Sequence, residues 1–160
     1  MSEAAGAASG QEPTAVRHTF ILFTVAATTY AIASRHVLHI EMIEHVTPVP
    51  NAPPSVEGVV FSRGQVVPVI NLRARFGFDR TSLDLRTRLL VVEHAGRRVG
   101  LLADDAREFV TIPANVIHPP NEAVGGTSGS YLEGVVMLGD RIVLVLDVRE
   151  VVESTPTAAA

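Results

Sequence analysis

The feature of this sequence that most constrains its fold is an internal repeat. The motif Glu57-Gly58-Val59-Val60 recurs as Glu133-Gly134-Val135-Val136, and the residues that follow continue to align without a gap. The other aligned segments are 65–73 with 141–149, 20–23 with 89–92, and 30–33 with 99–102. Chance similarity between valine-rich strands is the alternative, but a shared Asx and a shared Arg downstream of the motif argue against it. The repeat predicts two similar subdomains of about 70 residues each.

Each repeat consists of short apolar runs interrupted by Gly, Pro and Asn, which is the pattern of β-strands. We expect strands at 19–25, 29–34, 40–47, 56–61, 65–70, 88–93, 98–103, 109–112, 131–138 and 141–146. Helical turns are expected only at 35–38, 71–76 and 147–152. Many short strands at close spacing favour small barrels or a sandwich. Two such units side by side would leave a groove in which a ligand or a partner helix can bind.

Three dipeptides predict tight hairpin turns, namely Ala95-Gly96, Gly139-Asp140 and Arg63-Gly64. Gly64 is expected to supply a positive φ in the third turn. Arg63 would then point to solvent or across the groove, where its planar guanidinium can bridge carbonyl or carboxylate groups. Pro68 lies in the following strand and cannot donate a ladder hydrogen bond, which predicts an edge strand or a bulge.

The residue types that are missing exclude several classes of protein. The chain has no Cys, and its 13 basic residues are all arginine. It therefore has no thiol nucleophile, no cysteine-bound zinc, no Schiff-base lysine and no P-loop lysine. The net charge of −4 argues against nucleic-acid binding. Because no signal peptide and no apolar run of about 18 residues is present, we expect a cytoplasmic protein that does not insert into a membrane.

No catalytic or metal site is predicted. His36, His39 and His45 lie near acidic residues, but the His-Glu-x-x-His order is absent, and strand alternation would place the first two on opposite faces. Asp104 and Asp105 are adjacent at the end of a strand, so they are expected to diverge in a turn. No Gly-x-Ser-x-Gly motif is present. We therefore expect no catalytic residue, no metal and no cofactor.

Arginines crowd the segment that joins the two repeats, at Arg73, Arg75, Arg80, Arg86 and Arg88. A solvated linker with local ion pairs and a partner-binding patch are both compatible with this pattern.

The chain is expected to hold one domain at 17–153, flanked by disordered tails at 1–16 and 154–160. Its two halves lie at about 17–80 and 81–153, with exchange of strands between them left open. The glycine-rich stretch 125–130 predicts a mobile loop. Tails at both ends favour a complete single-domain protein.

The sequence from Glu57 to Gly77 resembles the signature of CheW-type coupling proteins. The matching pieces are Gly58, Arg63-Gly64, Val67-Pro68-Val69, Asn71-Leu72-Arg73 and Phe76-Gly77. The segments 96–104 and 138–141 match too, and the resemblance covers about residues 18–153. It implies a mainly β fold of two SH3-like five-stranded β-barrel subdomains with short helices. It also implies a non-enzymatic adaptor that couples the cytoplasmic tips of methyl-accepting chemoreceptors to the regulatory domain of a CheA-type histidine kinase.

The resemblance also implies roles for individual residues. Val37, Arg63, Leu89 and Phe109 match positions implicated in receptor docking along the groove. Gly58 and Gly100 match glycines whose replacement would disturb coupling, and His118, Glu122 and Ala123 match a segment that contacts the kinase regulatory domain in ring-like arrays. Core packing remains the alternative for the three apolar residues, and a purely structural role for the two glycines.

The sequence departs from the family pattern in three places. Phe61-Ser62 stands where the family usually has Asn-Leu, Ala123 where it often has an aromatic residue, and His39 where it often has a Glu near the hairpin arginine. An ion pair of Arg63 would then need Glu41 instead. These departures suggest a divergent copy that serves an array other than the principal flagellar one.

Two alternatives to the adaptor remain. One is a regulatory-domain-like or CheV-like module in a gliding, pilus or other pathway. The other is a β-barrel that binds a small ligand in its groove, although a content of two Tyr and no Trp argues against stacking on a sugar.

Overall fold

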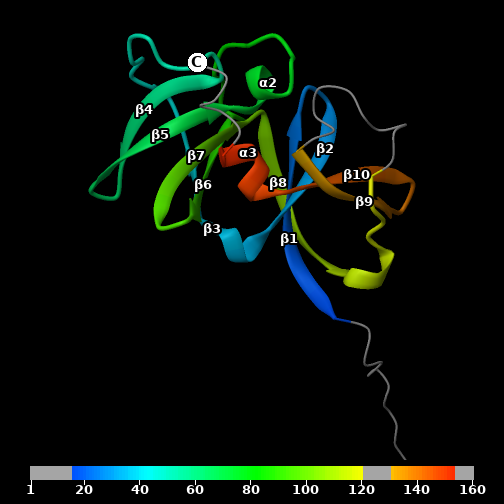
Figure 1. Ribbon diagram of the computed structural model, residues 1–160. Coiled ribbons are helices and arrows are strands. Elements are labelled where there is room, and N and C mark those ends of the chain that lie inside the picture. The colour runs from blue at the N-terminus through cyan, green and yellow to red at the C-terminus, as the bar shows by residue number, and fades with distance from the viewer. Residues whose placement is uncertain (1–15, 121–130, 154–160) are drawn as a thin grey trace, which may run out of the picture.

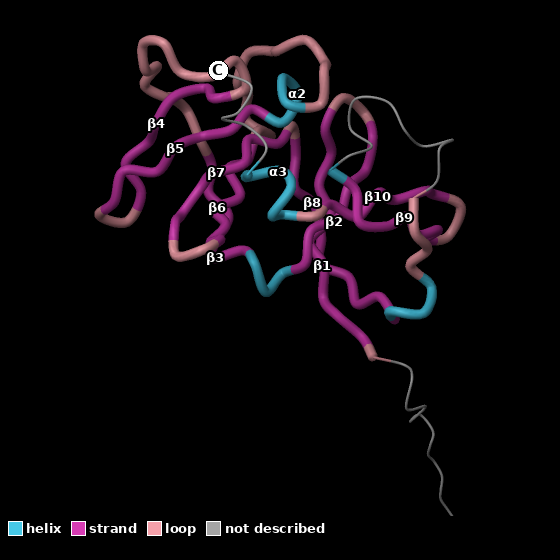
Figure 2. The backbone as a smooth tube through the Cα atoms, viewed as in Figure 1, coloured by secondary structure: helices cyan, strands magenta, loops and turns pink. Residues whose placement is uncertain are grey.

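The computed structural model describes residues 16–120 and 131–153, which form ten strands and four short helices. The strands are β1 Arg17–Val25, β2 Thr28–Ala33, β3 Val37–Met42, β4 Val56–Ser62, β5 Gln65–Asn71, β6 Arg88–His94, β7 Arg97–Ala103, β8 Asp105–Pro113, β9 Leu132–Leu138 and β10 Arg141–Leu146. The helices are the 3-10 turns η1 Ser34–His36 and η2 Ala114–Val116 and the α-helices α2 Leu72–Arg75 and α3 Val148–Glu153. Strands dominate the tube in Figure 2.

The strands form two five-stranded sheets that lie side by side, with α3 between them (Figure 1). We call them the central sheet, in the order β3-β6-β7-β5-β4, and the terminal sheet, in the order β8-β1-β2-β10-β9. The first two strands of each repeat pair with the last three of the other repeat. The parallel pairs β2–β10 and β5–β7 join the two sets of strands. The prediction of a mainly β fold with two five-stranded units and short helices is confirmed.

The core has three parts, because both faces of the inner strands are buried. In β1, Phe20 and Leu22 point into a cluster inside the terminal sheet, whereas Ile21 and Phe23 point into a cluster shared by the two sheets. We call the second one the shared cluster. A third cluster, around Leu89, fills the central sheet. Strands buried on both faces need continuous apolar runs rather than strict alternation, which is what the sequence shows.

A row of rings runs through the shared cluster and ends on a buried cation. Phe23 stacks on Tyr30, Tyr30 packs on Phe76, and Phe76 packs on Tyr131, with ring centroids 5.8, 5.1 and 5.5 Å apart. The Arg75 guanidinium lies 5.8 Å from the Tyr131 ring centroid. Arg75 also donates to the Val151 carbonyl, so it ties α2 to α3 across the two sheets. Burial lowers the pKa of this guanidinium.

The predicted hairpin turns form. Both residues of the Ala95-Gly96 turn have positive φ, 54° and 77°, and so do both residues of the Arg63-Gly64 turn, 49° and 83°. In the Arg63-Gly64 turn, a positive φ was predicted for Gly64 alone. The β1–β2 turn is the unexpected case, because it places two alanines, Ala26 and Ala27, at φ 50° and 69°.

Several strand boundaries differ from expectation, most of all those of β3, predicted at 40–47 and found at Val37–Met42, and of β8, predicted at 109–112 and found at Asp105–Pro113. β3 begins at Val37, three residues earlier than predicted, because the 3-10 turn closes with the Val37 amide donating to Ser34 and pairing with β6 follows at once. β8 is longer than predicted because it pairs with β1 along almost its whole length. No helix among the described residues is long and apolar enough to cross a membrane. The predicted tails, apart from Val16, and the predicted loop at 125–130 lie outside the described residues.

Candidate functional site

Val37 and Phe109 lie on the face of the molecule where the two sheets meet. Val37 begins β3 and packs against the shared cluster. Phe109 is paired with Ile21, a member of the shared cluster, and directly paired residues share one face of a sheet. Unlike Ile21, Phe109 is 64% exposed. An exposed phenylalanine that continues a buried apolar face is a candidate contact for a partner.

Leu89 and Gly100 form a packing pair inside the central sheet. Leu89 is fully buried, so its side chain does not reach the surface. A Cβ added at Gly100 would lie 2.7 Å from Leu89 Cδ1, which is too close for a side chain in the present packing. The structure therefore places these two predicted site residues beneath the surface rather than on it.

Gly58 sits at a close backbone approach where β4 meets the segment after β3. Backbone hydrogen bonds between Thr47 of that segment and Val59 of β4 run in both directions, at 2.9 and 2.8 Å. A Cβ at Gly58 would lie 2.0 Å from the Thr47 carbonyl oxygen, and its φ of +149° is one that L side chains rarely adopt. Only glycine fits here without a shift of backbone.

Arg63 is exposed at the tip of the β4–β5 hairpin, next to a polar cluster of His39, Glu41 and Ser62. The Ser62 hydroxyl donates to Glu41 Oε2, and His39 Nε2 lies 2.5 Å from the same oxygen and 3.2 Å from Ser62 Oγ. Since an ionised carboxylate only accepts hydrogen bonds, Nε2 carries the proton. Burial opposes the charge of Glu41, but the Ser62 and His39 hydrogen bonds and the Arg63 charge hold its pKa below the usual value.

This cluster does not have the geometry of a hydrolase. In a Ser-His-acid triad the serine and the acid use different ring nitrogens, whereas here both contact Nε2 and the serine donates to the acid. Ser62 is also buried. Within the described ranges, no three His, Cys, Asp or Glu residues are placed to hold a metal ion.

Of the three residues matched to the kinase-contacting segment, the structure places His118. Its backbone forms an isolated bridge with Val135 of β9, with hydrogen bonds of 2.9 and 2.7 Å in the two directions, and its side chain is exposed. Glu122 and Ala123 lie outside the described residues.

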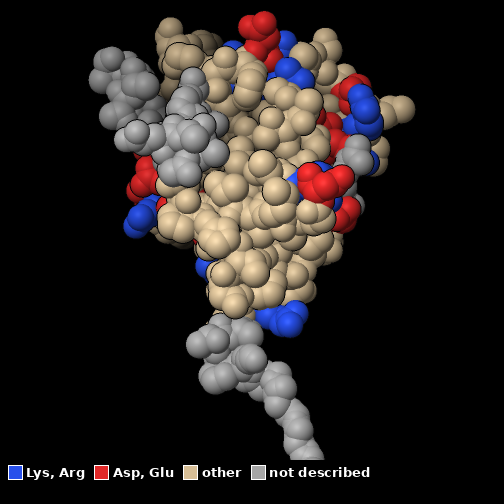
Figure 3. Space-filling view, turned by 90° about the vertical axis from the view of Figure 1, so that its right-hand side faces the viewer, with Lys and Arg blue, Asp and Glu red and all other residues tan. Residues whose placement is uncertain are grey.

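Two exposed apolar pairs at the hairpin ends were not predicted from the sequence. Phe61 and Val66 face each other near the β4–β5 turn, and Met137 and Ile142 do so near the β9–β10 turn. All four side chains are more than half exposed. The repeat held the signal, because the two pairs occupy equivalent positions in its two copies. The face on the β9–β10 side of the molecule is largely uncharged in its middle, with charges around its edge (Figure 3).

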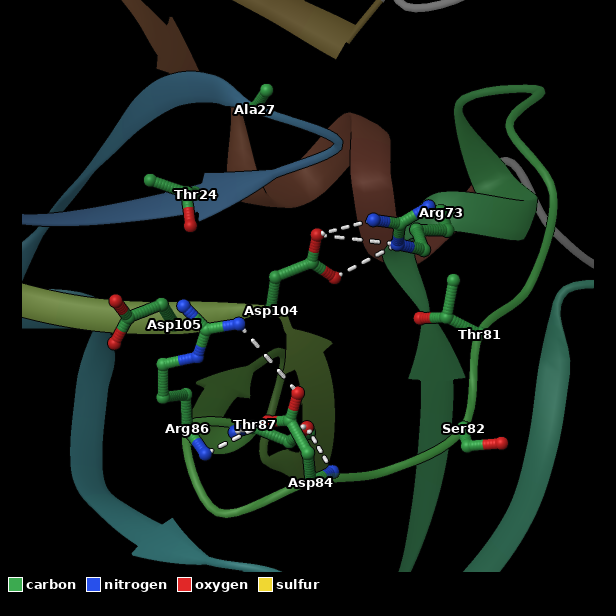
Figure 4. Close-up of a pocket in the computed structure, with 10 residues that line it drawn as sticks. All are labelled: Thr24, Ala27, Arg73, Thr81, Ser82, Asp84, Arg86, Thr87, Asp104 and Asp105. Atoms are coloured by element: carbon green, nitrogen blue, oxygen red, sulfur yellow. Dashed lines mark hydrogen bonds and ion pairs between the residues drawn. The ribbon is translucent and has the colours of Figure 1, made fainter.

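A polar cavity of about 440 Å³ lies beside Asp104, where the chain crosses from one sheet to the other (Figure 4). Asp104 separates β7 of the central sheet from β8 of the terminal sheet. Its carboxylate accepts from Arg73 Nε at 2.9 Å and Nη2 at 2.8 Å, and from the Ala26 amide at 2.8 Å. As expected, the Asp104 and Asp105 carboxylates point apart (Figure 4).

The arginine-rich segment is only partly a solvated linker. Arg73 and Arg75 belong to α2 and hold the two sheets together, as described above. Arg80 donates to Glu57 Oε1 at 3.0 Å and to the Pro54 carbonyl, which fastens the segment to the start of β4. Arg86 is exposed and lies 3.8 Å from Asp84.

Comparisons with known proteins agree with this architecture. Residues 19–155 match the model of the CheW-like domain. The chain is 30% identical to the chemotaxis protein CheW of Klebsiella aerogenes over 99% of this chain and 91% of that protein. It is 33% identical to the chemotaxis protein CheW of Helicobacter pylori over 93% and 90% of the two chains. The crystal structure of the scaffolding protein TtCheW from Thermoanaerobacter tengcongensis superposes with a TM-score of 0.79 at 25% identity, covering 92% of this chain and 94% of that one.

Because the family model spans nearly all of the described residues and the relatives align along almost their full length, the chain belongs to the CheW-like domain family.

Proposed function

We propose that the protein is a non-enzymatic adaptor that couples the cytoplasmic tips of methyl-accepting chemoreceptors to a CheA-type histidine kinase. The observation that carries this proposal is a CheW-like fold with exposed apolar side chains at separate places on its surface, the Phe109 face and the two hairpin ends. Exposed apolar groups of this kind mark contacts with other proteins. In this role the protein works in the cytoplasm and is recruited to membrane-bound receptor arrays.

The receptor is proposed to dock along the junction of the two sheets. Phe109 and Val37 offer apolar contacts on this face, and Arg63 offers a guanidinium that can bind carbonyl or carboxylate groups. Leu89 is buried, so its contribution is to support β3 from inside: it is paired with Glu41 of that strand. A substitution at Leu89 would thus act on docking through the shape of the strand.

The regulatory domain of the kinase is proposed to dock at the hairpin ends and at the segment that contains His118, Glu122 and Ala123. Gly58 and Gly100 serve this contact by allowing β4 and β7 to pack as they do, since a Cβ at either position would collide with a neighbour. A CheV-like or regulatory-domain-like role in a gliding, pilus or other pathway would use the same surfaces with different partners.

Reconstitution tests the proposal directly. Receptor-containing vesicles, kinase and this protein are mixed, and autophosphorylation of the kinase is measured with and without the adaptor. We expect stimulation only when all three components are present. Phe109→Glu should abolish receptor binding while the protein stays folded, and Leu85→Glu, a change at an even more exposed apolar residue of the joining segment, should not. Unchanged kinase activity and no binding of the wild-type protein to either partner would refute the adaptor function.

A further inference from the structure

A groove opens between the β4–β5 and β6–β7 hairpins of the central sheet because two neighbouring strands separate there. β5 pairs with β4 along almost its whole length, but it pairs with β7 only from Val69 to Asn71. Pro68, which has no amide hydrogen to donate to a ladder, stands directly before the first of these pairs. The sequence predicted an edge strand or a bulge at this proline. β5 is instead an inner strand, and its ladder to β7 ends at Pro68.

The second repeat indicates that the proline is what shortens this ladder. The parallel ladder between β10 and β2 includes Leu144 opposite Tyr30. In the repeat alignment these two residues are the equivalents of Pro68 and Val99, which are not paired in the central sheet. Leucine keeps the amide hydrogen that proline lacks, so the ladder of the terminal sheet can include this pair. In the central sheet the separation beyond Pro68 leaves a groove of about 290 Å³.

The groove has one apolar side and one basic side. β5 contributes Gln65, Val66 and Pro68 to its lining, and the start of β7 contributes Arg97 and Arg98. Val66 is 65% exposed and belongs to the apolar pair at the end of the β4–β5 hairpin. Arg97 is exposed and Arg98 is half-buried. Among the described residues, no acidic side chain lines the groove, whose two hairpin tips lie at the left of Figure 1.

The charges of the two arginines are not neutralised within the described part of the chain. Within residues 16–120 and 131–153, Arg97 and Arg98 form no ion pair and donate no side-chain hydrogen bond. Glu93 lies opposite Arg98 in the β6–β7 ladder without forming an ion pair with it. The equivalents of the two arginines in the second repeat are Thr28 and Thr29, so a hairpin of this kind does not need cations at these positions. A requirement outside the fold best explains both arginines.

We propose that this groove binds a segment of the kinase in which a carboxylate side chain lies next to an apolar one. The apolar side chain packs on Val66 and Pro68, and the carboxylate accepts hydrogen bonds from Arg97 and Arg98, whose planar guanidinium groups match its geometry. The inference rests on the proposed function, in which the kinase docks at the hairpin ends. It adds the chemistry by which the β4–β5 end selects its partner, because the uncharged threonines of the other repeat cannot make this selection.

Arg97→Thr/Arg98→Thr gives the groove the residues of the second repeat. Threonine is a good strand former, so urea denaturation should show an unchanged stability of the fold. We expect this variant to bind the full-length kinase about tenfold more weakly in calorimetric titration, the effect of two partly exposed charged contacts. Added salt should weaken binding of the wild type more than binding of the variant. Arg17→Thr/Arg149→Thr, which removes two exposed arginines from β1 and α3, is the matched control and should bind as the wild type does.

Wild-type affinity of Arg97→Thr/Arg98→Thr, or an equal loss in the control variant, would overturn the proposal. If the wild-type protein itself does not bind the kinase, the proposed function fails, and a peptide of alternating valine and glutamate then tests the groove alone. In an NMR titration this peptide should shift the side-chain Nε–H signals of Arg97 and Arg98, and a peptide of alternating valine and glutamine should not. Equal shifts with both peptides, or no shift with either, would rule out recognition of a carboxylate in the groove.

Discussion

Removal of the Asp104 carboxylate should loosen the attachment between the two sheets. Asp104 is placed where the chain crosses from β7 to β8, and it holds partners from both sides of that crossing. Arg73, in the helix that follows β5, belongs to the central sheet, and Ala26, in the β1–β2 turn, belongs to the terminal sheet. The Asp104 amide also donates to the Thr24 carbonyl at 3.0 Å. This last bond survives substitution because it uses the backbone.

The size of the effect follows from these contacts. Arg73 and Asp104 form a two-pronged charged pair whose side chains are 22% and 28% exposed, so solvent weakens but does not cancel it. The Ala26 amide adds one hydrogen bond to a charged acceptor, and water in the adjoining cavity can replace part of it. Asp104→Ala should therefore lower the free energy of unfolding by about 2–3 kcal/mol. Arg73→Ala leaves the Ala26 bond intact and should cost about 1–2 kcal/mol.

Urea denaturation of the wild type, the two single variants and the double variant measures the coupling between these side chains. The double variant should be only slightly less stable than Asp104→Ala, giving a coupling energy of about 1 kcal/mol or more. For a chain of this length, Asp104→Ala should lower Tm by about 4–12 °C. Glu44→Ala serves as the control for loss of an exposed carboxylate. Additive effects of the two single changes, or no loss of stability in Asp104→Ala, would refute the view that this pair joins the sheets.

Three further predictions concern stability. Gly58→Ala should destabilise the fold more than Gly100→Ala in urea denaturation, because the added Cβ meets backbone at the first position and the end of a flexible side chain at the second; the reverse order would contradict this. Ala27→Gly should stabilise the protein by about 0.5–1 kcal/mol, since it relieves a φ of 69° in an exposed turn; a loss of stability would count against strain in that turn. Burial, followed by the charges of Arg35 and His94, lowers the pKa of His36 from its usual 6.5. The unfolded chain then binds this proton first, so stability should fall as the pH drops below about 6.5, and His36→Gln should flatten that slope in thermal melts.

The strands and turns could be predicted from the sequence because their signals are local. Valine-rich runs between glycines, and dipeptides such as Ala95-Gly96, report on residues that are neighbours in the chain. Burial of a particular residue is not local in this sense. Leu89 and Phe109 are both apolar strand residues matched to one docking surface, yet one is fully buried and the other 64% exposed. What separates them is the face of the strand that each occupies and the element that covers that face, which depends on pairing between distant strands.

The contacts that join the sheets could not be predicted from the sequence for a related reason. Asp104 and Ala26 lie far apart in the sequence, and an aspartate next to another aspartate gives no indication of a distant arginine partner. The exposed hairpin pairs could have been found, because the repeat alignment places Phe61 opposite Met137 and Val66 opposite Ile142. The alternation within each hairpin then predicts that these residues point away from the barrel interior.

The two copies of the repeat offer a way to separate residues that serve the fold from residues that serve function. At some positions both copies hold an apolar residue that points to solvent, as at Phe61 and Met137. Such side chains add no buried apolar contacts to the core, so a docking surface best explains why both copies have them. Positions where the copies differ in kind show which copy has been specialised. Arg35 in the first copy aligns with Asp104 in the second, so within residues 16–120 and 131–153 the Asp104–Arg73 pair has no equivalent at the crossing after β2. The Asp104–Arg73 pair therefore joins the two sheets at the crossing from β7 to β8. The crossing next to Val37, where the receptor is proposed to bind, lacks such a pair among the described residues.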